Sequence, residues 1–423
     1  MNQPTKKVLS LFSGCGGMDL GFEGGFSVHK ANLNPIANFG WIEGPTDSEQ
    51  VLLKKNRFET VFANDINPDA QTAWTHFFKK SFGYSPTTFR LESVVDIVKR
   101  HKAGENILPK NVDVVTGGFP CQDFSLSGKR NGLNSHKDHT GKIIGDEDIP
   151  SIETRGQLYC WMKEVIEICQ PKVFVAENVK GLVNLGDVKD IIQKDFSATS
   201  NDGYLVVSPQ VLAAWKFGIP QNRERVIFIG FKRSALTPEA LEALSMEDIP
   251  KEFDPYPKAT HTKPVKKDVP EELSETKLSD ILSDLPEPDG VTDLSHRHYS
   301  KAKFMGKHCQ GQGEISLNGI SPTIRAEHHG NIEFRRLNAH NGGKNIKELQ
   351  AGKPQRRLSL RECARIQTFP DDFEFVIPAT GKTRKRWDLS PSQGYKVIGN
   401  AVPPFLAYHI ARNLEEKWNL FFK

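Results

Sequence analysis

Between residues 8 and 231, short apolar runs alternate with amphipathic stretches, and this alternation restricts the fold more than any other feature of the sequence. Five of the runs have the length and the β-branched or aromatic content of buried strands: 8–12, 60–63, 112–115, 173–176 and 225–231. Segments with helical periodicity, such as Gln157–Cys169, lie between them. Strands that alternate with helices predict an α/β fold with a mostly parallel sheet and right-handed crossovers.

The pattern changes after Phe231. Residues 232–300 are rich in Pro, Glu, Lys and Asp, and only Leu278–Leu285 has helical periodicity there. Helical patterns return at Ser359–Gln367 and Pro404–Trp418. We therefore predict an α/β domain over 1–231, a smaller irregular domain over 232–355, and a C-terminal segment over 356–423, of which 392–423 returns to the first domain.

Composition argues against several classes of protein. The 423 residues are 37% hydrophobic, and no apolar run approaches the roughly 18 residues that a membrane-spanning helix needs. Six cysteines form no C-x-x-C pair, and the first residues lack the apolar core of a signal peptide, so we expect a cytoplasmic protein with reduced thiols. A net charge of +4 permits nucleic-acid binding without arguing for it. No metal is expected, because no common zinc spacing is found at His296, His298, His308 and Cys309.

A glycine-rich turn follows the first predicted strand. It runs Phe12-Ser-Gly14-Cys-Gly16-Gly17, and glycines at such a turn let the backbone approach a nucleotide-like ligand. Asp19 stands where the dinucleotide pattern G-x-G-x-x-G requires its third glycine. The sequence thus predicts a nucleotide-like cofactor without a pyrophosphate cradle.

Acidic residues further along the chain are candidates for other cofactor contacts. Asp65, followed by Ile66, ends the second predicted strand, where a carboxylate can accept hydrogen bonds from ribose hydroxyls. The interval from the glycine turn is more than twice the usual value of about 20 residues, so we interpret residues 27–57 as an insertion. Asp96 and Ile97 are candidates for contacting an adenine amino group.

A possible nucleophile follows the strand at 112–115. Residues 117–125 read Gly-Gly-Phe-Pro-Cys-Gln-Asp-Phe-Ser, in which Pro120 restricts the backbone just before Cys121. A free cysteine is more often a small buried hydrophobe. The flanking glycines, Pro120, Gln122 and Ser125 instead favour a thiol at a strand tip, where it can meet a ligand.

Charged residues stand at two further strand ends. Glu177 ends the strand 173–176 and would lie beside Cys121 if the strands are ordered as in the sequence. Arg223 and Arg225 stand at the start of the last strand, where both can project into a cleft or can pair with Glu224 instead.

These motifs resemble those of the DNA cytosine-5 methyltransferases of prokaryotic restriction–modification systems. The glycine turn, the Gly-Phe-Pro-Cys segment and Glu177-Asn-Val match in family order, as do Arg155-Gly-Gln-Leu158, 357–370 and 393–404. The resemblance covers 8–230 and 356–405. It implies a Rossmann-like, S-adenosylmethionine-dependent methyltransferase domain with a target-recognition domain, acting on cytosine within a specific double-stranded DNA sequence.

The resemblance also implies roles for single residues. The Cys121 thiolate would add to cytosine carbon 6 and Glu177 would assist at ring nitrogen 3. Arg225 would bind the cytosine carbonyl oxygen, and Arg223 would orient the base or a phosphate. Residues expected to bind S-adenosylmethionine are Phe12, Gly14, Gly16, Gly17, Asp65, Ile66, Asp96, Ile97, Pro120, Leu158, Asn400 and Val402. Residues expected to bind DNA are Gln122, Ser125, Thr323, Arg325 and Asn331, of which Arg325 could read guanine and Asn331 adenine.

Three alternatives stay open from the sequence: a tRNA cytosine-5 methyltransferase of the same family, a non-catalytic DNA-binding regulator on the same fold, and a nicotinamide dehydrogenase. The long region 232–355 argues against the first, because duplex reading needs a dedicated module. Intact Cys121, Glu177 and Arg225 argue against the second, and Asp19 argues against the third. We expect a monomer that flips its target base out of the duplex, requires no membrane, and works alongside a separate cognate restriction endonuclease.

Overall fold

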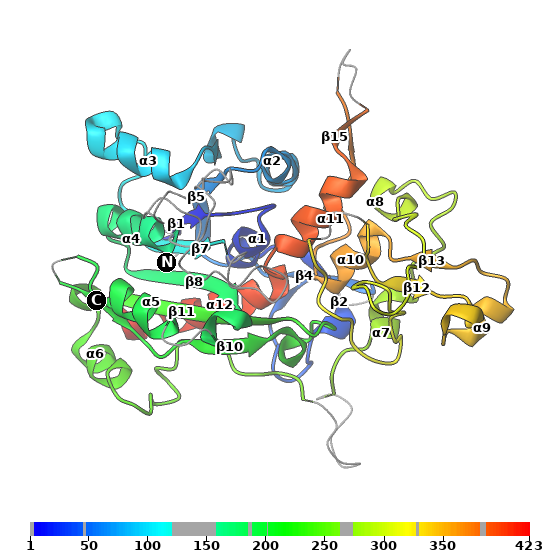
Figure 1. The fold of residues 1–423 in the computed structure, drawn as a ribbon. Coiled ribbons are helices and arrows are strands. Elements are labelled where there is room, and N and C mark those ends of the chain that lie inside the picture. Colours follow the sequence, from blue (N-terminus) through cyan, green and yellow to red (C-terminus); the bar gives the residue numbers. More distant parts are fainter. Residues whose placement is uncertain are drawn as a thin grey trace.

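The strands predicted from the sequence form one central sheet in the computed structural model (Figure 1). The structure describes residues 4–44, 48–120, 158–184, 188–200, 202–262, 274–326, 330–380 and 386–423. Within these residues the sheet has eight strands in the order β10-β11-β8-β7-β1-β5-β6, with β9 paired to β11. The five predicted runs correspond to β1 (Lys6–Leu11), β5 (Phe58–Asp65), β7 (Val114–Gly118), β8 (Val173–Val179) and β11 (Glu224–Lys232).

Parallel pairing dominates the middle of this sheet. β1 pairs with β5 and β7, β7 pairs with β8, and β5 pairs with β6 (Phe89–Leu91), all in parallel. β11 runs antiparallel to β8, to β9 (Tyr204–Val206) and to β10 (Gln210–Ala213). The central strands are nearly continuous apolar runs because helices cover both of their faces. The predicted α/β fold with a mostly parallel sheet is therefore confirmed.

Each face of the sheet has its own apolar core. One core joins the sheet to α3 (Val94–Arg100), α4 (Leu158–Cys169) and α5 (Val188–Ser197). The other joins it to α1 (Gly17–Glu23) and α2 (Pro68–Phe82). α2 begins at a capping residue, Asn67, whose side chain accepts a hydrogen bond from the Asp69 backbone N–H.

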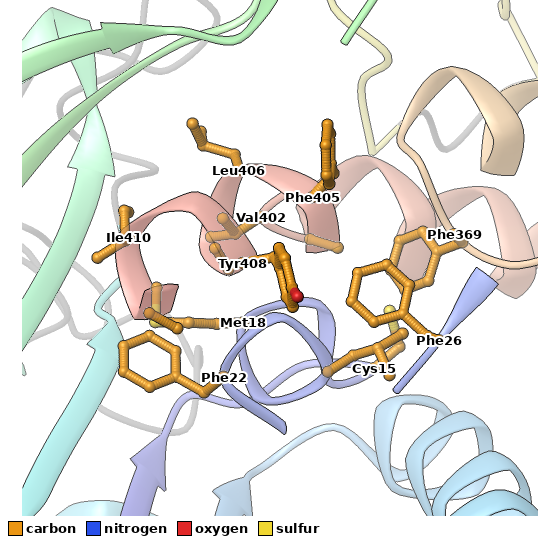
Figure 2. Packing of buried hydrophobic residues seen from close by; sticks show 14 of the residues in the cluster. Cys15, Met18, Phe22, Phe26, Phe369, Val402, Phe405, Leu406, Tyr408 and Ile410 are labelled. Atoms are coloured by element: carbon orange, nitrogen blue, oxygen red, sulfur yellow. The ribbon is translucent and has the colours of Figure 1, made fainter. Parts of the chain in front are cut away.

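The C-terminal segment packs on the same face as α1. It contains α11 (Pro391–Asn400), α12 (Pro404–Glu416) and α13 (Trp418–Phe421). Figure 2 shows α12 lying across α1, with apolar side chains of both elements filling the space between them. A segment more than 370 residues away in the sequence thus closes over the helix that follows the glycine turn.

The insertion expected at residues 27–57 folds into a small antiparallel sheet of its own. Its strands are β2 (Ser27–His29), β3 (Ile42–Glu43) and β4 (Gln50–Leu53), in the order β2-β4-β3. Trp41 lies beside β3 and packs edge-on against Phe405 and His409 of α12. The insertion therefore buttresses the C-terminal segment.

The region after β11 is built from short elements. They are α6 (Pro238–Leu244), α7 (Leu278–Leu282), α8 (Leu294–Arg297), β12 (Phe334–Arg336), α9 (Ile346–Gln350), β13 (Arg356–Arg357), α10 (Leu360–Ile366), β14 (Ile377–Pro378) and β15 (Trp387–Leu389). In Figure 1 α7, α8, α9, α10, β12 and β13 gather at the right of the view, whereas α6 lies at the opposite end, near the C-terminus. The Tyr256 hydroxyl donates to the Ile227 carbonyl of β11, so the first part of this region still packs on the sheet. The proposed domain boundaries stay a prediction. Among the helices of the described ranges, none combines the length and apolar character that crossing a membrane requires.

Candidate active site

The predicted functional residues come from strand ends that the sheet places side by side. Leu11 of β1 pairs with Asn64 of β5 on one side and with Gly117 of β7 on the other. Gly118 of β7 in turn pairs with Glu177 of β8. Because the strands are parallel, their carboxyl ends share one edge, where ligands bind in open α/β sheets.

The glycine turn occupies the centre of this edge. Phe12 follows β1 with φ 52°, a left-handed conformation that is uncommon for a bulky residue and that is often found at functional sites. A Cβ at Gly17 would lie 2.2 Å from the carbonyl oxygen of Val402, so only glycine permits this approach of the C-terminal segment. At Gly14 a Cβ would meet nothing within 4 Å, which leaves open space beside the turn.

Asp65 lies directly beside the glycine turn. Its carboxylate accepts hydrogen bonds from the backbone N–H groups of Gly14 and Asn67, both at 2.9 Å. Burial raises the pKa of Asp65, and these backbone hydrogen bonds oppose that rise. The long interval that the insertion creates in the sequence therefore does not separate Asp65 from the turn.

Two exposed apolar side chains accompany Asp65. Ile66 is 45% exposed and Leu91, which pairs with Asp65 across β5 and β6, is 41% exposed. The sequence predicted Ile66 as a cofactor residue but missed Leu91. The strand that carries Leu91 has only three residues, which is too short to show the alternation of apolar and polar residues typical of a strand.

Asp96 and Ile97 lie in helix α3 and not at a strand end. The Ser93 side chain accepts a hydrogen bond from the Val95 N–H and starts that helix, although Val94 and Val95 are β-branched. Ile97 is fully buried in the core and presents no surface to a ligand, so its predicted adenine contact is not supported. Glu92 follows β6 instead, and its carbonyl accepts a hydrogen bond from the Asn64 side chain at 2.7 Å.

Glu177 and Arg225 form an ion pair next to the end of β7. The Nε atom of Arg225 lies 2.6 Å from Oε1 of Glu177, and the two side chains are only 12% and 11% exposed. Glu224 does not take part, because its carboxylate pairs with Lys180 at 2.9 Å. The alternative in which Glu224 pairs with the neighbouring arginines is therefore wrong for Arg225.

The residue after Glu177 ties β8 to the segment that leads to the predicted nucleophile. The Asn178 side chain donates to the carbonyl of Phe119 at 3.2 Å. Pro120 ends the described segment, and the predicted residues Cys121, Gln122 and Ser125 lie outside the described residues.

Arg223 is a buried residue of the interior, although the sequence suggested a contact with the base or a phosphate. It is 1% exposed, and its guanidinium donates to the carbonyls of Ile324, Gly399 and Ala401 at 2.7–3.2 Å. These bonds join the start of β11 to two distant segments. In this structure the guanidinium has no access to DNA.

Arg325 and Asn331, predicted as separate DNA contacts, lie against each other. Arg325 donates to the Asn331 carbonyl at 3.2 Å and pairs with the buried carboxylate of Glu333 at 3.3 Å. The Asn331 side-chain oxygen accepts from Gln312. The Thr323 hydroxyl donates to the carbonyl of Asn222 and is engaged within the protein. The Arg325 side chain remains 28% exposed.

Three further predicted cofactor residues lie at the ends of helices or just beyond them. Leu158 begins α4 and is buried beside Tyr159. Asn400 ends α11 and is exposed, whereas Val402 is buried with its carbonyl against Gly17.

A family model described as C-5 cytosine-specific DNA methylase matches residues 6–416. The chain belongs to this family. The enzyme thus methylates carbon 5 of cytosine in DNA, as members of the family do. This result decides against the dehydrogenase and the non-catalytic regulator, and it favours DNA over tRNA.

Curated relatives of the methyltransferase agree with this placement. Type II methyltransferase M.BsuRI of Bacillus subtilis is 31% identical, covering 96% of this chain and 78% of the relative. Type II methyltransferase M.NgoFVII of Neisseria gonorrhoeae is 30% identical, covering 98% of this chain and 87% of the relative.

Solved structures support the fold alone. The Entamoeba histolytica methyltransferase EhMeth superposes with a TM-score of 0.54 at 14% identity, covering 98% of this chain and 99% of that one. The S. pombe Dnmt2 methyltransferase superposes with a TM-score of 0.52 at 16% identity, covering 97% of this chain and 99% of that one.

Proposed function

We propose that the methyltransferase transfers a methyl group from S-adenosylmethionine to cytosine within one specific double-stranded DNA sequence, through a covalent adduct of Cys121. The observation that carries this proposal is the buried Glu177–Arg225 pair beside the end of β7, the strand that leads to Cys121. The similarity to Type II methyltransferases supports a role in restriction–modification, with a separate cognate endonuclease.

The residues around the glycine turn suit S-adenosylmethionine. The open space at Gly14 leaves room for the ligand, and Asp65 supplies carboxylate oxygens for ribose hydroxyls. Ile66 and Leu91 offer exposed apolar surface against which an adenine ring can pack. When bound, S-adenosylmethionine supplies an electrophilic methyl group on a positively charged sulfur.

Phe12, Gly16, Gly17, Pro120, Leu158, Asn400 and Val402 complete the proposed cofactor site. Asp96 stays a prediction at its margin, and Ile97 is replaced by Leu91, because Ile97 is fully buried.

Covalent catalysis makes the cytosine ring reactive. The Cys121 thiolate forms a bond to carbon 6, and the displaced electron pair of the ring is drawn toward nitrogen 3. The Glu177 carboxyl group donates a hydrogen bond or a proton at nitrogen 3, which makes carbon 5 an electron-rich centre able to accept the methyl group. Return of the nitrogen 3 proton to Glu177, loss of the carbon 5 proton to solvent and cleavage of the bond between carbon 6 and the cysteine sulfur then restore the aromatic ring, the Glu177 carboxyl group and the thiolate.

The arginines have different roles in this scheme. Arg225 holds the Glu177 carboxyl group through its Nε atom and can place the rest of its guanidinium near the cytosine carbonyl oxygen. Arg223 acts as a positioning residue, because backbone carbonyls occupy its guanidinium.

Recognition of the DNA sequence is assigned to region 232–355, which lies outside the residues used for chemistry. The target cytosine must leave the duplex to reach Cys121, as in other base-flipping enzymes. Arg325 is the best candidate for reading a guanine, since its charged side chain is partly exposed and is held by Glu333.

A covalent-trapping experiment tests the nucleophile. DNA in which cytosine is replaced by 5-fluorocytosine should trap the enzyme with S-adenosylmethionine present, because fluorine blocks the final removal of the carbon 5 substituent. Cys121→Ala should abolish the trapped species on a denaturing gel, whereas Cys309→Ala, a half-buried cysteine of the recognition region, should not. Trapping by the Cys121→Ala variant would refute the assignment.

A further inference from the structure

Two fully buried glutamines, Gln221 and Gln367, form a chain of hydrogen bonds through the interior. The Ile324 N–H donates to Oε1 of Gln221 at 2.9 Å, and Nε2 of Gln221 donates to Oε1 of Gln367 at 2.8 Å. Nε2 of Gln367 donates to the carbonyl of Ile398 at 2.8 Å. The chain therefore links four segments that are distant in the sequence.

The direction of each bond is fixed by the two ends of the chain. An amide side chain offers an oxygen that only accepts and a nitrogen that only donates. Ile324 presents a backbone donor and Ile398 a backbone carbonyl, so a reversed orientation of either glutamine would set like groups against each other. A buried polar network in which every group is satisfied rigidifies the segments that it joins and specifies one arrangement of them.

At one end, the chain of hydrogen bonds between the two glutamines holds the segment that carries Arg325. The backbone of Ser321 exchanges hydrogen bonds with Pro220 and Asn222, both at 2.8 Å, so this segment runs alongside Gln221. The position of Arg325 is thus set by the same stretch of chain that leads into Arg225.

At its other end, this chain of hydrogen bonds holds the junction between α11 and α12. This junction lies between the proposed cofactor turn and the backbone of Arg325. On one side the Val402 carbonyl packs on Gly17. On the other side a Cβ at Gly399 would lie 2.1 Å from the backbone carbon of Arg325, so the two backbones touch.

Backbone strain next to Gln367 indicates that its position is imposed. Thr368 has φ 63°, a left-handed conformation that is costly for a β-branched residue and that persists only where the surroundings hold it. Its hydroxyl donates to the Gln367 carbonyl at 2.6 Å and accepts from the Phe405 N–H at 3.1 Å. These bonds anchor Gln367 to the first turn of α12.

We propose that Gln221 and Gln367 are positioning residues that couple DNA recognition to cofactor binding. The amide chain fixes the segment of Arg325 relative to the glycine turn, so that cognate DNA and cofactor each strengthen the binding of the other. This inference rests on the proposed function, in which the turn binds S-adenosylmethionine and Arg325 faces DNA. Coupling of this kind must be reciprocal.

Calorimetry of the full chain with S-adenosylhomocysteine as the probe tests the coupling. The titration is performed under three conditions: without DNA, with a duplex that carries the target sequence, and with a duplex of scrambled sequence. Bisulfite sequencing identifies the target sequence beforehand. In the unmodified enzyme the cognate duplex should tighten binding by about fivefold or more, the lower end of typical coupling. In Gln367→Met that factor should fall below about twofold, with affinity in the absence of DNA nearly unchanged.

Two further variants separate coupling from general damage. Gln193→Met removes a glutamine of α5 whose side chain donates to the carbonyl of Val206 in β9 at 3.1 Å, and this variant should keep the full coupling. Gln221→Met combined with Gln367→Met should lose no more coupling than either alone, because both belong to one chain. Gln221→Asn, which retains a shorter amide, replaces the Met variants if their thermal unfolding shows that they do not fold.

The outcomes distinguish this inference from the proposed function. Full coupling in the glutamine variants, or none in the unmodified enzyme, would overturn the inference, even when trapping through Cys121 occurs as expected. Failure of S-adenosylhomocysteine to bind, or trapping without Cys121, would instead overturn the proposed function.

Discussion

The central sheet and the recognition region differ in the polarity of their large buried side chains. The β8 and β11 strands are buried through apolar side chains such as Phe174, Val175 and Ile229, each without exposed surface. In the recognition region and the segment after it, the large buried side chains include arginines: Arg336, Arg356, Arg357 and Arg361, each at most 4% exposed. Apolar burial is non-directional, whereas each guanidinium needs particular partners at particular angles.

A network of ion pairs accompanies the apolar core of the recognition region, in which Leu278, Ile281 and Ile324 are fully buried. Arg356 donates to both oxygens of Glu362 and also to Glu287, while Arg336 donates to Glu287 and Glu348. Burial alone would raise the pKa of Glu287, but hydrogen bonds from Arg336 and Arg356 hold it at about 2. Each ion pair of the network requires a particular orientation of its guanidinium, which suits a region that we propose to present side chains to base edges.

The largest effect is expected at the sheet edge. Glu177→Gln keeps the shape of the side chain but removes the titrating proton, so turnover of DNA methylation should fall by about 10²- to 10⁴-fold. Cofactor affinity should change little, because Glu177 lies outside the proposed cofactor site. Glu224→Gln, whose exposed carboxylate pairs with Lys180, serves as the matched control and should keep turnover. Near-normal turnover of Glu177→Gln would show that another group serves nitrogen 3.

A single change should disrupt the ion-pair network that joins the recognition region to α10. Glu362→Gln leaves the buried guanidinium of Arg356 without its main partner, so unfolding in urea should show a loss of about 3–5 kcal/mol. Glu374→Gln removes a surface partner of Lys80 and should cost about 0–1 kcal/mol. Equal losses in the two variants would contradict the contrast between directional burial and surface pairing.

Sequence discrimination should change more modestly. Arg325→Lys keeps a positive charge for Glu333 but loses the two parallel donors of a guanidinium, so discrimination at one guanine should fall by about 1–3 kcal/mol. Methylation of a library with each position of the target randomised measures this loss. A uniform decrease over all sequences, with a weaker salt dependence, would identify Arg325 as a phosphate contact.

For a single step of one pH unit, the smallest effect is expected in the aromatic core beneath the insertion. Burial among aromatic rings lowers the pKa of His409 to about 3, far below the ordinary value near 6.5. The folded state therefore binds this proton less readily than the unfolded state, and stability should fall as pH drops from about 6.5 toward 3, by at most about 1.4 kcal/mol per pH unit. His409→Phe should remove that part of the slope in unfolding curves measured at several pH values. An unchanged slope would show that other groups cause the acid sensitivity.

The residues at strand ends could be predicted from the sequence, because the carboxyl ends of parallel strands meet at one edge of a sheet. Asp65 and Glu177 follow recognisable apolar runs, and the structure places both at one edge. The contact of Ile97 stays a prediction, and the sequence could not show that Ser93 starts a helix whose packing buries the Ile97 side chain. Leu91 was missed because its strand has only three residues.

The sequence by itself determined the alternation of strands and helices, and it supplied the residues that we propose for the chemistry. Local periodicity encodes which face of each element is buried, and the motifs mark where strands end. Only the tertiary structure decided which polar groups pair inside the protein. Arg223 reaches the carbonyl of Ala401, and Gln221 reaches Gln367, across more than 140 residues of chain. No local pattern specifies such partners, because a long polar side chain bonds with whichever group the packing of distant segments brings within reach.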